Sequence, residues 1–304
     1  MRVVVGVDAG GSRTIAAAAR GGEQPHTFTG EAANPSVLGI DGAVDAIAGA
    51  VAGALRDDTA SAIVVGAAGA GNAEIASAMM HALRARFPDA LVAVTHDARI
   101  ALRGAIPGGD GIVLIAGTGS LAYAELGGRS FRAGGGGYAL GDEGSGFAIG
   151  SAALRLLLRL FEGRGASNPL LEALASHTGA AGARELLSYV YGGGTPVATV
   201  AAIAPIVLKF ANEGERSANK IVQAAALELF ELVRAVCGLA GAGAVELPLA
   251  FSGGLLRTNG VLSYLIEVRI AGDLPYLRIV KNGGDPYAGA LAEARALLAR
   301  GRLA

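Results

Sequence analysis

Two stretches decide the fold: VVVGVDAGGSRT (residues 3–14) and IVLIAGTGS (residues 112–120). Each begins as an apolar strand, passes through a turn rich in glycine and hydroxyl side chains, and leads into a second apolar stretch. Such a turn exposes backbone N–H groups that can hold phosphate oxygens. One copy is weak evidence, since glycine at a hairpin tip often only satisfies turn geometry. Two copies, aligned so that Ser12 matches Ser120, predict a duplicated nucleotide-binding fold.

The elements predicted around the two turns follow the same order. Predicted strands are 3–7, 15–19, one near Thr27, 62–67 and 91–94, then 112–116, 121–125, one near Phe131, 247–251 and 276–280. Predicted helices are 41–55, 73–86 capped by Asn72, 98–103 opened by Asp97, one ending near Phe161, several between 170 and 241, one from Leu255 and one from Pro286 capped by Asp285. Alternating strands and helices predict mixed α/β sheets covered by helices. We expect domains 1–106 and 107–285, with helix 286–304 crossing back to complete the first.

Composition narrows the class of protein. The chain has 304 residues, 52% of them hydrophobic and 17% charged, which predicts a globular protein. Its net charge of −1 favours a small-molecule ligand over nucleic acid. A single cysteine, Cys237, leaves no disulfide framework or cysteine cluster within one chain, as in a reducing cytoplasm. The first strand begins within two residues of Met1, and glycines or charges interrupt every long apolar run, so we expect neither a signal peptide nor a membrane span.

Phosphoryl transfer needs backbone donors and Mg²⁺ at the phosphates, and a base aligned with the attacking hydroxyl. Asp8 ends the first strand, where a carboxylate could hold hydrated Mg²⁺ bridged to phosphate oxygens. A turn-capping role for Asp8 fits the spacing equally well. The four histidines are widely spaced and predict no metal site.

A series of short motifs runs through nearly the whole chain: DAGGSRT (8–14), ANP (33–35), GAAGAG (66–71), THDA (95–98), GTGS (117–120), GDEGS (141–145), SGG (252–254) and DPYAGA (285–290). Each is unspecific alone, but their order and spacing resemble the N-acetylglucosamine kinases of the BadF/BadG/BcrA/BcrD-type ATPase family, in the actin, Hsp70 and sugar-kinase superfamily. The resemblance implies an α/β fold of two ribonuclease H-like domains, the duplicated actin-like ATPase fold, with a cleft between them. It also implies ATP and Mg²⁺ as cofactors, and a homodimer is possible because family members often form one.

The resemblance assigns roles to residues of this chain. Asp97 would be the general base that accepts the proton of the attacking sugar hydroxyl, with a helix N-cap as the alternative. Asn34 and Asp142 would hydrogen-bond sugar hydroxyls, with loop capping as the alternative, and Gly136 and Gly137 would belong to the same sugar pocket. The residues implied for ATP are Gly10, Gly11, Ser12, Thr14, Gly117, Thr118, Gly119, Ser120, Ala211, Gly253 and Gly254, with Asp8 at the metal.

Two positions depart from the family pattern. Ala9 stands where glycine is usual, and Gly136 stands where many members carry tryptophan. Without an indole, the sugar pocket should be wider or less apolar.

We therefore expect an ATP-dependent amino-sugar kinase acting on N-acetylglucosamine at its 6-hydroxyl, with glucosamine and N-acetylmuramic acid as alternatives. An ATPase activator of 2-hydroxyacyl-CoA dehydratases would need two cysteines per subunit for its shared cluster, and the chain has one. A sugar-responsive repressor would need a DNA-binding extension before the first strand.

Overall fold

The computed structural model describes residues 2–193, 196–243, 245–256, 260–281 and 283–301. The chain divides into two compact units, one comprising residues 1–109 and 282–304 and the other residues 110–281. Each unit is described by itself.

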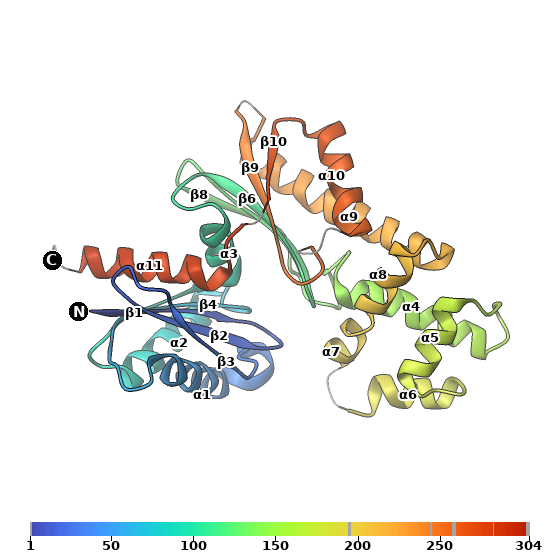
Figure 1. Cartoon of the computed structure of the whole chain (residues 1–304), viewed down its shortest axis with the longest axis horizontal. Coiled ribbons are helices and arrows are strands. Elements are labelled where there is room, and N and C mark those ends of the chain that lie inside the picture. Colours follow the sequence, from blue (N-terminus) through green and yellow to red (C-terminus); the bar gives the residue numbers. More distant parts are fainter. Residues whose placement is uncertain (1, 194–195, 244, 257–259, 282, 302–304) are drawn as a thin grey trace. The chain divides into compact units, whose positions relative to one another are not determined.

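The first unit is built on a five-stranded mixed sheet in the order β3-β2-β1-β4-β5 (Figure 1). Its strands are β1 (Val3–Ala9), β2 (Thr14–Arg20), β3 (His26–Gly30), β4 (Ala60–Ala67) and β5 (Leu91–His96). β1 pairs antiparallel with β2 and parallel with β4. Its helices are α1 (Pro35–Leu55), α2 (Ala73–Arg86), α3 (Asp97–Ala105) and α11 (Pro286–Arg300).

The second unit repeats this topology in the order β10-β9-β6-β7-β8. Its strands are β6 (Gly111–Ala116), β7 (Ser120–Leu126), β8 (Arg129–Gly134), β9 (Leu247–Ser252) and β10 (Leu277–Val280). Its helices are α4 (Gly146–Phe161), α5 (Pro169–Thr178), α6 (Ala183–Tyr191), α7 (Pro196–Ala201), α8 (Ala204–Asn212), α9 (Arg216–Ala240) and α10 (Val261–Asp273). β6 pairs antiparallel with β7 and parallel with β9, as β1 does with β2 and β4, so the predicted duplicated α/β fold is confirmed.

Strand periodicity explains how helices cover both faces of the first sheet. Val3, Val5 and Val7 of β1 belong to a core cluster with α1 and α2, whereas Val4 belongs to a separate cluster with α3 and α11. Successive side chains of a strand point to opposite faces, so an uninterrupted apolar strand is buried on both. Figure 1 shows α11 (red) beside β1 (blue), although they come from opposite ends of the chain.

Glycines allow α11 to approach this sheet and α3 closely. A Cβ on Gly6 of β1 would lie 2.4 Å from the backbone nitrogen of Leu291. On Gly289 of α11 it would lie 2.0 Å from the carbonyl oxygen of Ile100, and on Gly104 of α3 it would lie 2.4 Å from that of Asp285. α3 and α11 therefore pack backbone against backbone, and this contact fixes the helix that begins with Asp97.

The starts of two helices differ from the predictions, whereas Asp285 is confirmed at the N-cap position of the last helix. α10 begins at Val261 and not at Leu255, because Leu255 and Leu256 are buried in a turn after β9. α1 begins at Pro35, six residues before the prediction, and is interrupted at Gly39, whose φ is +70°. Asp285 occupies the N-cap position of α11 but makes no side-chain capping hydrogen bond. The last helix ends at Arg300, and residues 302–304 of the predicted range lie outside the described residues.

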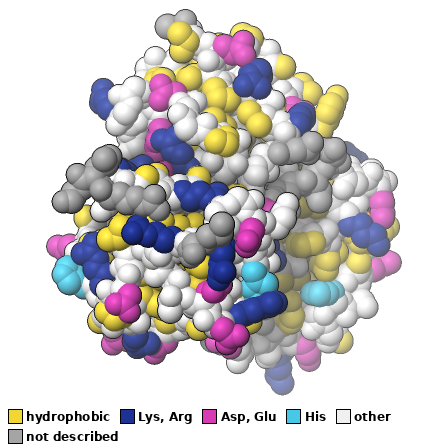
Figure 2. All heavy atoms as spheres, turned by 60° about the vertical axis from the view of Figure 1, so that its left-hand side comes forward, with side chains coloured by type: hydrophobic (Ala, Val, Ile, Leu, Met, Phe, Trp, Pro, Cys, Tyr) yellow, Lys and Arg dark blue, Asp and Glu magenta, His cyan; other side chains and the backbone are white. Residues whose placement is uncertain are grey.

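By length and composition α1 could span a membrane, contrary to the expectation from the sequence, and the bent combination of α6 with α7 and α8 passes only if it counts as one span. Val44, Ile47 and Val51 of α1 are instead buried in the core of the first unit. The core helix of a folded domain passes the same test. On the face shown in Figure 2, Lys and Arg side chains are interspersed with Asp and Glu.

Candidate active site

In the first unit the predicted residues gather at one edge of the sheet. Strand register places Asp8 of β1 beside Gly66 of β4, and Gly66 beside Thr95 of β5. Asp97 follows two residues after Thr95. Adjacent strands are about 4.8 Å apart, so Asp8 and Asp97 start from strands roughly 10 Å apart. Both carboxylates thus lie at the carboxyl ends of parallel strands, where open α/β sheets bind their ligands.

The predicted phosphate-binding turn at residues 10–14 is tied to the segment that carries Asn34. The backbone N–H of Gly10 donates to the carbonyl of Arg13 (3.0 Å), which closes the turn between β1 and β2. The N–H of Ala33 donates to the carbonyl of Gly10 (3.1 Å), so residues 33–34 attach to this turn. Thr14 is fully buried, and its Oγ1 has no hydrogen-bond partner among the described residues.

Asn34 caps α1 and lies between two glycine turns. Its Oδ1 accepts from the N–H of Ser36 (2.9 Å), so the capping predicted as an alternative is present. A Cβ on Gly69 would lie 2.9 Å from this oxygen, and one on Gly11 would lie 3.9 Å from Nδ2. Capping engages the carbonyl oxygen of the side chain and leaves the amide group on the side of Gly11, at the phosphate loop.

Asp97 opens α3, but its neighbour provides the N-cap. The Nδ1 of His96 accepts from the N–H of Arg99 (3.2 Å), so a neutral His96 carries its proton on Nε2. Oδ1 of Asp97 accepts from the N–H of Ala98 (2.9 Å). The N-cap alternative for Asp97 is therefore wrong, because the preceding side chain takes that position. The carboxylate lies half-buried in the first turn of the helix, at the positive end of the helix dipole.

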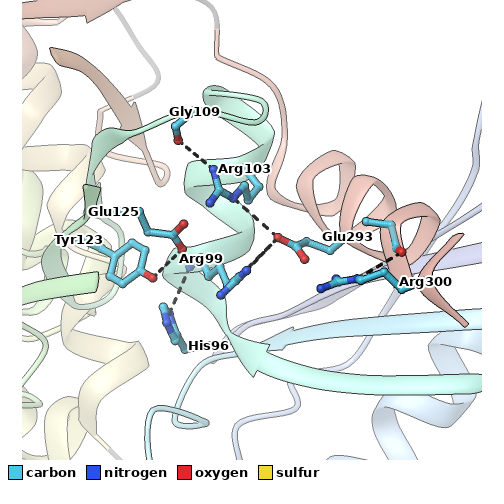
Figure 3. A network of polar contacts seen from close by, with 9 residues as sticks. His96, Arg99, Arg103, Gly109, Tyr123, Glu125, Glu293 and Arg300 are labelled. Atoms are coloured by element: carbon cyan, nitrogen blue, oxygen red, sulfur yellow. Dashed lines mark hydrogen bonds and ion pairs between the residues drawn. The ribbon is translucent and has the colours of Figure 1, made fainter. Parts of the chain in front are cut away.

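Ion pairs between α3 and α11 hold α3 in place. Arg99 and Arg103 of α3 converge on Glu293 of α11 (Figure 3), with Arg99 Nη2 3.3 Å and Arg103 Nε 3.7 Å from Oε1. Arg103 also donates from Nη1 to the carbonyl of Gly109 (2.8 Å). Together with the glycine contacts, these pairs orient the helix that carries Asp97.

In the second unit, the second phosphate loop lies against the start of α4. The N–H of Gly146 donates to the carbonyl of Gly117 (2.8 Å), and that of Phe147 donates to the carbonyl of Thr118 (3.2 Å). Gly253 approaches from β9: its φ is +88°, and a Cβ there would lie 2.2 Å from the carbonyl oxygen of Ala116. The predicted phosphate-binding turn at 117–120 and the motif at 252–254, whose glycines are also implied for ATP, therefore meet at the ends of β6 and β9.

Asp142 is bound to this phosphate loop. Its Oδ1 accepts from the N–H of Ser120 (3.1 Å), and the Oγ of Ser120 donates to the carbonyl of Glu143 (2.6 Å). A Cβ on Gly119 would come within 2.9 Å of all three carboxyl atoms, so only glycine lets the carboxylate lie there. Asp142 itself has a φ of +59°, which is uncommon for a residue with a side chain. Burial raises the pKa of Asp142, and nearby Glu143 adds to this, whereas the Ser120 N–H and Arg132 oppose it.

The structure allows a side chain at Gly136. Its φ is not in the left-handed range, and the nearest atoms to a built Cβ, those of Leu140 and Gly141, lie 3.7 Å away. Gly137, with a φ of +79°, accepts from the N–H groups of Leu140 and Gly141 and closes a tight turn. Ala211 is buried near the end of α8, so its side chain lies within the core of the second unit.

The donor set fits a nucleotide whose Mg²⁺ is held mainly by phosphate oxygens and water. A Cβ on Gly117 or Gly254 would meet no atom within 4 Å, which leaves the tips of both turns open. The unpartnered Oγ1 of Thr14 adds an orphaned polar atom at the first turn. Among the described residues, no group of three or more His, Cys, Asp or Glu side chains could hold a metal by itself. Asp8 alone suits an ion that arrives with its own phosphate ligands.

A cavity of about 270 Å³ opens in the second unit between Tyr138 and helices α4, α6 and α7. Tyr138, next to Gly137, lines it and packs on Phe147 with ring centroids 5.2 Å apart. Leucine, valine and proline side chains form most of the remaining wall, and Arg155 supplies a cation.

The sequence analysis assigned no role to two residues of this region. Ser145 is fully buried and caps α4 by accepting from the N–H of Ala148 (3.2 Å). Arg132 of β8 donates to the carbonyls of Gly134 and Gly135. The serine could have been found as a cap before an apolar helix, but nothing local predicts contact between the arginine and the loop that follows it.

Comparison with known proteins agrees with this geometry. Residues 5–294 match the BadF/BadG/BcrA/BcrD ATPase family. The chain belongs to this family. It is 31% identical over 236 residues to the N-acetylmuramic acid/N-acetylglucosamine kinase of Clostridium acetobutylicum, with 77% of each chain covered. It is 32% identical over 183 residues to the N-acetyl-D-glucosamine kinase of Dictyostelium discoideum, covering 59% of this chain and 57% of the relative.

The similarity to one solved structure covers almost the whole chain. The crystal structure of a candidate N-acetylglucosamine kinase from Chromobacterium violaceum superposes with a TM-score of 0.79 at 28% identity, covering 98% of this chain and 99% of the other. The family prediction and the fold class are thereby confirmed.

Proposed function

We propose that this family member is an ATP-dependent kinase that phosphorylates an amino sugar, with N-acetylglucosamine as the favoured acceptor and the 6-hydroxyl as the site of transfer. The observation that carries the proposal is the match to kinases of N-acetylated amino sugars, 31% identical over 77% of the chain. The geometry of each unit supports it: a glycine turn follows β1 and another follows β6, and Asp97 is half-buried at the same edge of the first sheet as the turn after β1.

In this proposal Asp97 acts as the general base. Its carboxylate accepts the proton of the attacking hydroxyl as the oxygen bonds to the γ-phosphorus and the bond from phosphorus to the β,γ-bridging oxygen breaks. Asn34 and Asp142 orient the sugar through its other hydroxyls, since amide and carboxylate groups suit partners that both donate and accept. Bound Mg²⁺, held through Asp8, would supply charge neutralisation at the phosphates. The turns at 10–14 and 117–120 would hold the phosphate oxygens.

The test is a sugar panel. The protein is incubated with Mg·ATP and, separately, N-acetylglucosamine, glucosamine, N-acetylmuramic acid and glucose, and both ADP and sugar phosphate are measured. We expect stoichiometric sugar phosphate and ADP, with the highest kcat/KM for N-acetylglucosamine. Phosphate at C6, located by NMR, would support the assigned position. ADP release without phosphorylation of any sugar would reject a kinase acting on this panel and favour an ATPase.

A further inference from the structure

The start of the loop formed by residues 134–142 of the second unit, called here the acceptor loop, is held by one arginine side chain. Arg132 donates from Nε to the carbonyl of Gly134 (3.2 Å) and from Nη2 to the carbonyl of Gly135 (2.9 Å). Gly134 and Gly135 both have positive φ, +78° and +69°. The planar guanidinium thus donates to two consecutive carbonyls of a glycine turn, a task that suits its rigid fork of donors.

A side chain at position 135 would require the Arg132 guanidinium to move, and the φ of +69° at Gly135 also favours glycine. A Cβ on Gly135 would lie 1.9 Å from Nη2 of Arg132, so the guanidinium packs directly on that Cα. From there the loop is tied to its surroundings: the N–H of Gly135 donates to the carbonyl of Ser120 (2.9 Å), and a Cβ on Gly141 would lie 3.1 Å from the nitrogen of Gly136. The arginine, the loop and the end of the phosphate loop form one connected set.

We propose that Arg132 is a positioning residue of the acceptor site, which fixes the backbone of the 134–137 turn and, through the contacts of this turn with Ser120, the place of the Asp142 carboxylate. This inference rests on the proposed function in so far as Asp142 binds the acceptor. In this proposal Arg132 acts through its hydrogen bonds to the Gly134 and Gly135 carbonyls and not by direct contact with the sugar.

Charge gives Arg132 a second effect on Asp142. Burial and Glu143 raise the pKa of Asp142, while Arg132 and the Ser120 N–H lower it. Only an ionised Asp142 accepts from both the Ser120 N–H and a sugar hydroxyl without itself donating. Loss of the Arg132 charge raises the pKa of Asp142 further, so at a given acidic pH a larger fraction of the enzyme carries a protonated Asp142.

The test compares Arg132→Gln and Arg132→Lys with Arg129→Gln as the matched control. Arg129 lies on the same strand and stacks over Phe131, with 5.1 Å from Cζ to the ring centroid, so its replacement removes the same charge away from the loop. For R132Q we expect the sugar KM to rise about tenfold or more, as for loss of charged hydrogen bonds, with the ATP KM within about twofold. The acid limb of kcat/KM for the sugar should move to higher pH.

The lysine variant separates charge from shape. R132K keeps the cation, so its acid limb should stay where the wild type has it, but one ammonium cannot replace the guanidinium fork, so the sugar KM should still rise. R129Q should match the wild type in both measurements. An unchanged sugar KM and acid limb in R132Q, or equal changes in R129Q, would overturn the proposal.

Hydrogen exchange of the loop tests the same contact without catalysis. In R132Q the amides of Gly135 and Gly141 should exchange faster than in the wild type, while the core strands β6 and β9 keep their protection. If the wild type phosphorylates no sugar yet R132Q loosens this loop, the proposed function fails and the loop contact stands. Equal exchange in both proteins removes Arg132 from its role.

Discussion

Replacement of Gly289 by alanine probes the packing that sets the orientation of Asp97. Gly289 lies in the first turn of α11 and faces α3, which begins with Asp97. The added Cβ would lie 2.0 Å from the carbonyl oxygen of Ile100 and 2.5 Å from the nitrogen of Gly104. Both are backbone atoms within α3, so neither can rotate aside as a flexible side chain could. The two helices must separate or tilt.

The size of the effect follows from this overlap. Ordinary contact begins at 3.4 Å, so the nearest pair must open by 3.4 − 2.0 = 1.4 Å. Overpacking of this kind costs about 1–3 kcal/mol, against up to about 1 kcal/mol that alanine gains over glycine in a helix. We expect a net loss of about 1–2 kcal/mol and a Tm lower by about 2–8 °C. Displacement of Asp97 by about 1 Å should also lower kcat by up to about a hundredfold.

Gly238→Ala provides the matched control. Gly238 lies near the end of α9 in the second unit, and a Cβ there would meet nothing within 4 Å. This variant should be as stable as the wild type or about 0.5–1 kcal/mol more stable, with unchanged kcat. Thermal unfolding followed by circular dichroism, together with initial rates well below the Tm, measures both effects. A Gly289→Ala protein with wild-type Tm and kcat would refute the reasoning.

Three further substitutions and one control variant test the site. Asp97→Asn should reduce kcat by at least about 10²-fold with ATP affinity within about twofold, and near-normal turnover in a coupled ADP assay would remove Asp97 as the base. Asn34→Ala and Asn72→Ala should each lower the free energy of unfolding, measured with urea, by about 0.5–2 kcal/mol, because each removes a helix cap. Only Asn34→Ala should raise the sugar KM. A similar rise in both variants would contradict the role assigned to Asn34. The raised pKa of Asp142 means that its stabilising contribution is complete below its unfolded pKa and is lost as pH rises through the folded one. At neutral pH the free energy of unfolding of Asp142→Asn should therefore be equal to or higher than that of the wild type, and any difference should shrink as the pH falls. The sugar KM should rise in the same variant. A variant that is less stable than the wild type at pH 7 but equally stable in acid would contradict the direction of this pKa shift.

Much of the fold was predictable because it depends on local patterns. Continuous apolar strands separated by glycine turns predicted the repeated strand order, and Asn72 was correctly predicted as the cap of α2 from its place before an amphipathic run. Predictions failed where an apolar segment served the core in another conformation. Leu255 and Leu256 are apolar enough to start a helix, but they are buried as a turn after β9.

The sequence indicated which residues belong to the candidate site better than it indicated which groups those residues contact. Motif order brought Asp8, Asn34 and Asp97 into consideration, and strand register does bring Asp8 and Asp97 to one edge of the first sheet. No sequence signal indicated that His96 would cap α3 in place of Asp97 or that Asp142 would bind the Ser120 N–H. These hydrogen bonds depend on which of several neighbouring acceptors lies closest to a given N–H in the folded chain.

The sequence by itself determined a duplicated α/β fold with a glycine turn after the first strand of each half, because strand burial and turn geometry are local properties of the chain. Tertiary structure decided how those turns are held. α11 reaches α3 across 185 residues at Gly289 and Gly104, and Arg132 and Asp142 lie at opposite ends of one loop folded against Ser120. Such contacts join segments whose proximity exists only once the chain has folded, so only the assembled structure reveals them.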